Sequence, residues 1–240
     1  MTLKKWCILV IIIIFLLTLS VIIYSKTKFI HIDYDDFIKK SQYNYIGSKL
    51  SNNSTMKMNY EEDLKLDGFF IDEQVETLED LKNLSDYILI VSNEKKPLFL
   101  GNSIINTCNV IKVIKGNNIK ESDEIKIYDL VFNWDSLSTI YIGGNTPLLI
   151  GDEYVVFLKK VENGSIKNAY VFSSVNYGRV SILKERKVLD NYEYGSLNLD
   201  EIMQYDYVFS KGTEKEKQKY KKMVKEIRND VYKLNYGEKK

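Results

Sequence analysis

The chain has 240 residues, of which 45% are apolar, 28% charged and 12% aromatic, and its formal net charge is +1. The apolar fraction is too high for a disordered chain, and the balanced charge excludes a general nucleic-acid binder, which would carry a basic excess. The length suits one domain with additional segments.

The first predicted element is an apolar run from Cys7 to Tyr24 that contains no charged residue. As a helix it spans about 27 Å, close to the roughly 30 Å hydrocarbon core of a bilayer. Two lysines and Trp6 precede the run, which suits a membrane interface with the N-terminus in the cytoplasm. We therefore predict a cytoplasmic stub over residues 1–6 and a single-pass transmembrane anchor over residues 7–24. The anchor contacts membrane lipid, and the bulk of the chain is extracytoplasmic.

A cleaved signal peptide is the alternative interpretation of this segment. The apolar core of a signal peptide is usually 7–15 residues long and ends at a site of small residues. The present run is longer, and Thr18-Leu19-Ser20 is the only weak match to such a site. A lipoprotein cysteine would follow the apolar run, whereas Cys7 stands before its core. We favour the uncleaved signal-anchor.

A tether over residues 25–60 is predicted to follow the anchor. The spacing of Asp35, Phe37, Ile38 and Tyr45 allows a short helix within it. A polar break near residues 52–55 then separates the tether from the domain that begins at residue 61.

An acidic stretch over residues 61–86 opens the domain. Thr77 and Asp80 have the spacing of a capping box, with Asp80 in the place of the usual Glu. Apolar residues then recur at helical spacing. This pattern predicts a short amphipathic helix that ends near Ser85.

Strand-like segments separated by polar turns come next. The predicted strands are Tyr87–Ser92, Ile104–Ile114, Glu124–Leu130, Glu153–Lys159, Ala169–Ser173 and Arg179–Leu183. Several short strands at this spacing indicate a small barrel or sandwich.

A long connection from Val131 to Gly151 interrupts this rhythm. Connections of this length are usually functional or disordered, although residues 139–142 can add a short strand. Aromatic residues on such a loop often stack on ligands, so Trp134 and Tyr141 are our candidate partner-binding residues. The alternative is that the loop folds back and buries Trp134 on the barrel.

The C-terminal segment, residues 186–240, is predicted to contain an amphipathic helix. Thr213 and Glu216 form a second capping box, and apolar residues follow at helical spacing. From Lys211 to the end there are 10 Lys and one Arg against five acids. Either the helix docks on the barrel and leaves a solvated basic face, or that face meets anionic lipid or wall polymer.

The order of several short motifs resembles a known family. A helix ends in Ser-Asp before the strand at Tyr87, a long strand ends in Val-Ile-Lys-Gly at Gly116, and Leu149–Leu158 reads Leu-Ile-Gly-Asp-Glu-Tyr-Val-Val-Phe-Leu. Over residues 77–183 this resembles bacterial exported proteins of the tissue-inhibitor-of-metalloproteinases-like, or netrin-like, OB-fold group. The resemblance implies an OB-like five-stranded β-barrel within residues 61–185 and a binding role.

The resemblance does not extend to metalloproteinase inhibition. The animal inhibitors act through an N-terminal cysteine, and this chain has no counterpart of it. Cys7 lies in the predicted anchor, and Cys108 is expected to be a small core residue. A disulfide-stapled scaffold and a cysteine-rich zinc site are excluded as well.

Catalytic signatures are weak throughout the sequence. His31 is the only histidine, which excludes a histidine-based metal cluster or catalytic triad. Ser181 and Lys184 match a Ser-x-x-Lys pattern, but its downstream elements are missing. We therefore assign no catalytic, cofactor-binding or metal-binding residue and expect no enzyme activity.

Together these features predict a mainly β fold with flanking helices (α+β). It comprises an N-terminal transmembrane helix, a small OB-like β-barrel and a C-terminal amphipathic helix. The predicted function is a membrane-anchored binding or scaffolding module for a protein or cell-wall polymer, without a cofactor or nucleic acid. One alternative is an inhibitor or immunity-type protein that acts through the 131–151 loop. The other is a carboxylate-dependent hydrolase, which would need acids clustered in a concave site with perturbed ionisation.

Overall fold

The computed structural model describes residues 14–15, 17–18, 42–46, 75–100, 103–135, 138–142, 144–162, 166–182, 187–190, 198–209 and 214–236. The chain divides into two compact units, Met1–Asp33 and Tyr34–Lys240. In the first unit the described residues are helical, and the Thr18 hydroxyl donates hydrogen bonds to the carbonyl oxygens of Ile14 (3.1 Å) and Phe15 (2.8 Å). Among all described residues, no helix combines the length and apolar character needed to cross a membrane. Most of the anchor predicted over residues 7–24 lies outside the described residues.

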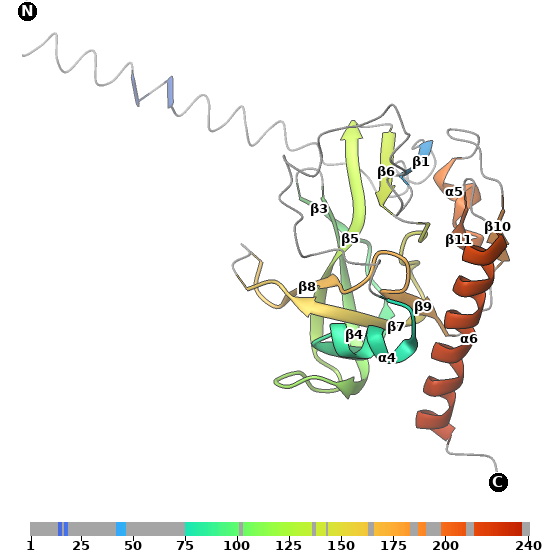
Figure 1. Ribbon diagram of the computed structural model, residues 1–240. Coiled ribbons are helices and arrows are strands. Elements are labelled where there is room, and N and C mark those ends of the chain that lie inside the picture. Colours follow the sequence, from blue (N-terminus) through green and yellow to red (C-terminus); the bar gives the residue numbers. More distant parts are fainter. Residues whose placement is uncertain are drawn as a thin grey trace, which may run out of the picture. The chain divides into compact units, whose positions relative to one another are not determined.

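The second unit is built on a closed, five-stranded β-barrel (Figure 1). Its strands are β2 (Tyr87–Asn93), β4 (Ser103–Lys115), β5 (Glu124–Asp135), β7 (Asp152–Lys160) and β8 (Ala169–Phe172). They pair in the closed order β2-β4-β5-β8-β7-β2, in which only the β5–β8 pair is parallel. The mainly β, OB-like barrel predicted from the sequence is confirmed.

Within the described residues, further strands and three helices surround the barrel. The strands are β1 (Gln42–Ile46), β3 (Leu98–Leu100), β6 (Ser138–Ile142), β9 (Arg179–Ser181), β10 (Lys187–Leu189) and β11 (Tyr205–Val208). The helices are α4 (Leu78–Leu84), α5 (Leu199–Ile202) and α6 (Glu214–Tyr236). β3 pairs with β4, β9 pairs with β7, and β10 and β11 form a separate two-stranded parallel sheet.

The prediction of a long connection from Val131 to Gly151 is wrong for the first half of this segment. β5 continues to Asp135 and forms an antiparallel hairpin with β6, so Trp134 and Tyr141 lie on strands rather than on a loop. β-branched and aromatic residues on both segments favour this pairing over a loop. The short strand expected over residues 139–142 is confirmed as β6.

The short helix allowed within the tether is also corrected at Tyr45. Residues Gln42–Ile46 form β1, which pairs in parallel with β6 and places Tyr45 opposite Tyr141. The aromatic and β-branched residues of β1 suit a strand, and the edge of β6 supplies backbone partners that a local helical pattern does not reveal. β1, β6 and the far end of β5 therefore form an extension of the barrel sheet (Figure 1).

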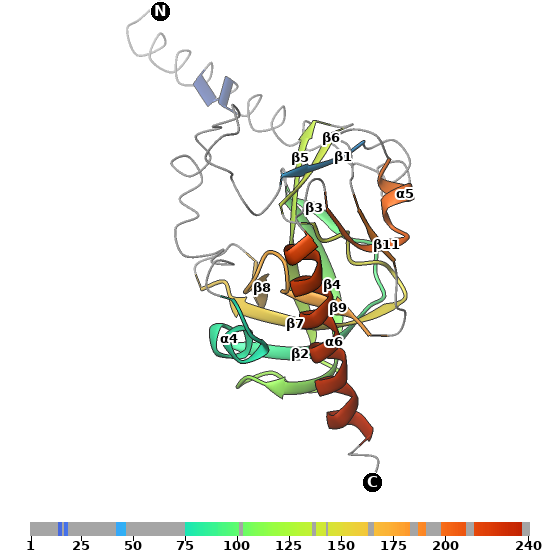
Figure 2. The same ribbon diagram turned by 45° about the vertical axis from the view of Figure 1, so that its right-hand side comes forward.

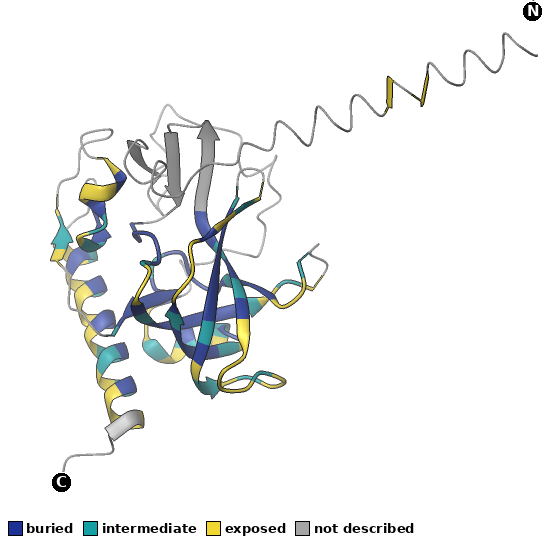
Figure 3. Ribbon diagram, turned by 180° about the vertical axis from the view of Figure 1, so that it is seen from behind, coloured by how far each residue is buried: buried dark blue, intermediate teal, exposed yellow. Residues whose placement is uncertain are grey.

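Two apolar cores lie on opposite faces of the β2–β7 part of the barrel. Alternate residues such as Leu89 and Val156 point into the barrel, where Cys108 is also buried. The residues between them, such as Ile90 and Phe157, join the second core with α4 and α6. Figure 2 shows α6 running across this outer face, and Figure 3 shows its buried residues. Docking of the C-terminal helix on the barrel is confirmed.

Helix α4 forms where the capping box predicted it. The Thr77 side chain accepts a hydrogen bond from the Asp80 backbone (3.1 Å), and the Asp80 carboxylate accepts one from the Thr77 backbone (2.8 Å). The carboxylate also accepts a hydrogen bond from the Thr77 hydroxyl (2.8 Å), and this bond, together with the one from the Thr77 backbone, holds the pKa of Asp80 below its usual value. The helix places Leu81 in the outer core, fully buried.

Replacement of Leu81 by alanine tests this outer core. Because Leu81 is fully buried between α4, the barrel and α6, we expect Leu81→Ala to lower the free energy of unfolding by about 2–5 kcal/mol. Urea unfolding of the full chain measures this change. Glu79→Ala, at an exposed position of the same helix, is the control and should change stability by no more than about 0.5 kcal/mol. Equal effects of the two variants would contradict the packing described.

Candidate functional site

A buried ion pair lies inside the barrel. Asp129 of β5 and Arg179 of β9 approach to 3.4 Å (Oδ1 to Nη1), and both side chains are almost fully buried. The Asn106 side-chain amide donates to Asp129 Oδ2 at 3.0 Å, and the Arg179 guanidinium lies 5.6 Å from the centre of the Phe172 ring. These neighbours compensate two charges that would otherwise be costly to bury.

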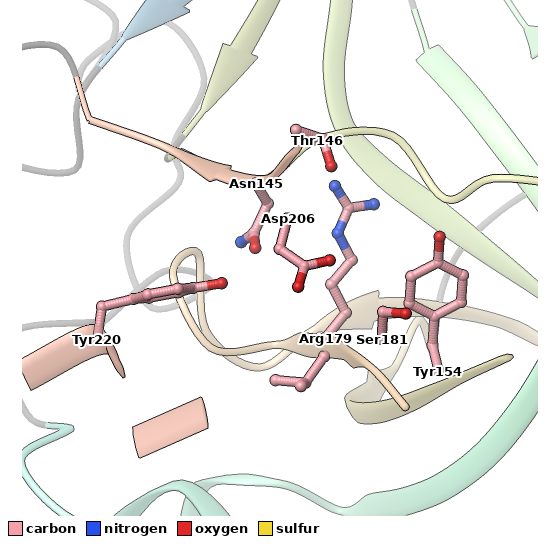
Figure 4. A pocket seen from close by; sticks show the side chains of 8 residues that line it. Asn145, Thr146, Tyr154, Arg179, Ser181, Asp206 and Tyr220 are labelled. Carbon is pink, nitrogen blue, oxygen red and sulfur yellow. The ribbon is translucent and has the colours of Figure 1, made fainter. Parts of the chain in front are cut away.

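Arg179 also borders a small cavity between the barrel and α6 (Figure 4). The polar side chains that line it are Asn145, Thr146, Tyr154, Arg179, Ser181, Asp206 and Tyr220. The free space is about 10 Å³, roughly what one water molecule requires. A small-molecule substrate is much larger, since ligand pockets usually measure about 300–1,000 Å³.

Hydrogen bonds join four segments around this cavity. The Tyr154 hydroxyl accepts from the Leu149 backbone N–H (2.8 Å), and the Thr146 hydroxyl donates to the Tyr205 carbonyl (2.9 Å). On α6, Arg228 pairs with Asp206 at 2.9 Å and donates from Nε to the Ser181 carbonyl at 3.1 Å. The cavity is thus the junction that joins the 144–150 segment, β9, β11 and α6.

The second half of the segment from Val131 to Gly151 is fixed to this junction rather than free. Asn93 donates from Nδ2 to the carbonyl of Leu148, whose side chain is buried in the barrel core. A Cβ atom at Gly144 would lie 2.2 Å from the Val208 carbonyl oxygen, so this close approach requires glycine. The inhibitor alternative requires an accessible loop over residues 131–151. From residue 144 on, this segment is instead part of the folded core.

Shifted pKa values around the site follow burial. Burial raises the pKa of Tyr154 to about 12, against the Leu149 hydrogen bond that lowers it, and burial also raises the pKa of Tyr220. Burial raises the pKa of the Cys108 thiol to about 12, which agrees with its prediction as a core residue. On the surface, a hydrogen bond from Lys95 lowers the pKa of Glu124.

Asp206, which lines the cavity, and Asp129 are each paired with an arginine. The hydrolase alternative needs one carboxyl group held protonated and a second one nearby. Neither the water-sized cavity nor these ion pairs provides that arrangement. In the described part of the chain, no three His, Cys, Asp or Glu side chains are grouped so that they could hold a metal ion.

The two aromatic residues predicted to bind a partner lie on the neighbouring strands β5 and β6. Tyr141 of β6 is opposite Val131 of β5, and Trp134 lies where the β5–β6 register shifts. Their backbone positions are described, whereas their side chains lie outside the described set. Both residues therefore belong to the sheet extension.

Sequence reasoning missed the residues of the junction. Asp129 was visible as an acid on the same strand face as two isoleucines, and that face proved to be the barrel interior. Its partner Arg179 is 50 residues away in the chain, and Asp206 and Arg228 come from separate elements. An acid on an apolar strand face was the one available signal for a buried polar cluster.

No known protein family and no curated protein matches the chain.

Removal of one partner of the buried ion pair tests its role. Arg179→Met leaves Asp129 buried without its cation, so we expect the free energy of unfolding to fall by about 3–5 kcal/mol. Arg179→Met combined with Asp129→Asn should recover a large part of that loss, because neither charge remains. Lys95→Met, which removes the exposed pair with Glu124, is the control and should leave stability nearly unchanged. A double variant no more stable than the single one would contradict this account.

The two buried tyrosines give a matched pair of variants. Tyr154→Phe leaves the Leu149 N–H without its hydrogen-bond acceptor and should lower the free energy of unfolding by about 1–3 kcal/mol at pH 7. Tyr220→Phe removes a hydroxyl that faces the cavity and has no hydrogen-bond partner in the described chain, so its effect at pH 7 should be small.

The same tyrosines predict loss of stability at alkaline pH. Their pKa values are higher in the folded state than the ordinary value of 10.0, so the unfolded chain loses these protons first. Both contributions are complete below pH 10, and that of Tyr154 is lost as the pH rises toward 12. Urea titrations over this range should show a shallower decline in each Phe variant than in the parent. An unchanged pH slope in both variants would contradict the burial of the hydroxyls.

Proposed function

We propose that the protein is a membrane-anchored, extracytoplasmic binding or scaffolding module. A transmembrane helix over residues 7–24 would hold an OB-like barrel outside the membrane, where it binds a protein or cell-wall polymer. The apolar, uncharged sequence of the anchor supports this location. The Thr18 hydroxyl, bonded back to helix carbonyls, is of the kind tolerated in lipid.

The observation that carries the binding role is the sheet extension formed by β1, β6 and the far end of β5. The barrel interior is filled by apolar side chains and the Asp129–Arg179 pair, so it leaves no room for a ligand of substrate size. The extension instead adds strands outside the barrel, and it carries Trp134 and Tyr141 on adjacent strands. Strand edges and aromatic residues are common elements of protein recognition.

Membrane attachment and orientation can be tested in intact cells. We expect full-length chain in the membrane fraction, with an uncleaved N-terminus by mass spectrometry and a domain that external protease removes. A shortened, soluble chain would contradict the anchor. A membrane-bound chain protected from external protease would contradict the orientation.

Photo-crosslinking tests the recognition surface. A photo-reactive benzoylphenylalanine replaces Trp134 or Tyr141 in the full chain, and Lys120, exposed on the turn between β4 and β5, is the control position. We expect adducts of discrete mass from positions 134 and 141 and none from position 120.

Alanine substitution supplies the quantitative counterpart. If Trp134 is a central contact, Trp134→Ala should weaken binding of the crosslinked partner by about tenfold or more, since buried aromatic anchors commonly contribute over 1 kcal/mol. An absence of adducts at both positions, or equal adducts at position 120, would contradict the proposal. Deletion of residues 131–151 is unsuitable as a test because it also removes the buried Leu148.

A further inference from the structure

Helix α6 carries paired charges beside the barrel and mostly unpaired lysines on its opposite, outward face, within the described residues. Its apolar face packs on the outer core of the barrel through Tyr220, Met223, Val224, Ile227 and Val231. The basic residues that flank this face pair with acids of other elements: Lys217 with Asp190 (3.4 Å), Lys219 with Glu76 (2.8 Å) and Arg228 with Asp206 (2.9 Å). The charges on the barrel side of the helix are thus neutralised.

The opposite face of α6 is basic and exposed. The lysines on it are Lys215, Lys221, Lys222, Lys225 and Lys233. Lys222 has a helix neighbour, Glu226, at 3.8 Å, and the other four form no ion pair within the described residues. Two acids on the helix are exposed, Glu214 and Glu226, whose side chain is 42% exposed beside Lys222, and Asp230 pairs with Lys82 at 2.8 Å. A chain with a net charge of +1 therefore carries a local basic face about 27 Å long, at 1.5 Å per residue.

One apolar side chain stands at the C-terminal end of this basic face. Tyr232 is 46% exposed and precedes Lys233. Leu234 is also exposed, but it follows Ile227 by two helical turns and therefore lies on the barrel side of the helix. A tyrosine beside lysines suits a lipid interface, where the ring enters the boundary and the amines meet headgroup phosphates.

We propose that the outward face of α6, with Tyr232 at its end, docks on an anionic lipid surface. The apolar face of α6 remains packed on the barrel. The helix therefore holds the domain to the bilayer while it stays attached to the barrel. This inference rests on the proposed membrane anchoring, which places the domain beside such a surface. The anchor raises the effective concentration of the lipid, so a weak contact is sufficient.

Lysine footprinting of the reconstituted full chain tests the contact. Vesicles of neutral phosphatidylcholine are compared with vesicles that also contain phosphatidylglycerol, and an amine reagent that does not cross the bilayer labels the outward-facing chains. Mass spectrometry reads each lysine separately. Lys120 and Lys160, exposed elsewhere on the domain, are internal controls.

We expect Lys215, Lys221 and Lys225 to react at least fivefold more slowly on the anionic vesicles, with no change at the two control lysines. High salt should remove the difference, because exposed charges are screened. The triple variant Lys221→Glu, Lys222→Glu, Lys225→Glu should abolish protection at Lys215. A basic residue near an anionic bilayer contributes about fivefold in affinity, so losing three weakens the contact about 100-fold.

Equal labelling of α6 on the two kinds of vesicle would overturn the inference. Protection by soluble polyphosphate but not by anionic vesicles would overturn it as well, because the face would then recognise a polymer. Failure of the anchor is a separate result, since the chain would then not remain with neutral vesicles after carbonate washing. Retention on neutral vesicles thus tests the anchor, and labelling of α6 on anionic vesicles tests the helix, so the two proposals can fail independently.

Discussion

The structure depends on the need to cover both faces of the β2–β7 sheet. Both faces of these two strands carry apolar side chains: one set points into the barrel and the other points outward. This is unusual for an antiparallel pair, because antiparallel sheets often leave one face to solvent. Ile88, Ile90, Val155 and Phe157 would be bare if only the barrel interior were filled. Each such side chain gains about 1.5–3 kcal/mol from burial, so α4 and α6 are required to complete the fold.

This constraint limits where the protein can bind a partner. The barrel interior is occupied, the outer face of β2 and β7 lies under the helices, and the junction cavity is the size of a water molecule. The surfaces that remain for recognition include the β1–β6–β5 extension and the outward face of α6. Our proposals assign the first to a protein or polymer partner and the second to lipid.

Features set by neighbouring residues were predictable from the sequence. The capping box of Thr77 and Asp80 fixed the start of α4, and the apolar runs that became β2, β4 and β7 were located within one or two residues. Helical spacing also identified the side of α6 that packs on the barrel. In each case the residues that form the sequence pattern are also the residues that make the local structure.

Features that join distant segments were not predictable. Arg179 meets Asp129 only because the barrel brings β9 and β5 together, and β1 finds its partner at the edge of β6. The extent of β5 was underestimated because its end is stabilised by pairing with β6 and not by its own alternation. The candidate residues Trp134 and Tyr141 were therefore placed on a loop, although they lie on paired strands.

Native-state hydrogen exchange of the full chain is the most direct test of the central claim that barrel and helix form one unit. If α6 completes the β2–β7 sheet, the slowest amides of β2, β7 and α6 should open with the same free energy, and urea should affect them equally. If α6 amides exchange at a much lower free energy while β2 and β7 stay protected, the helix is an accessory to a self-sufficient barrel, which would contradict the account.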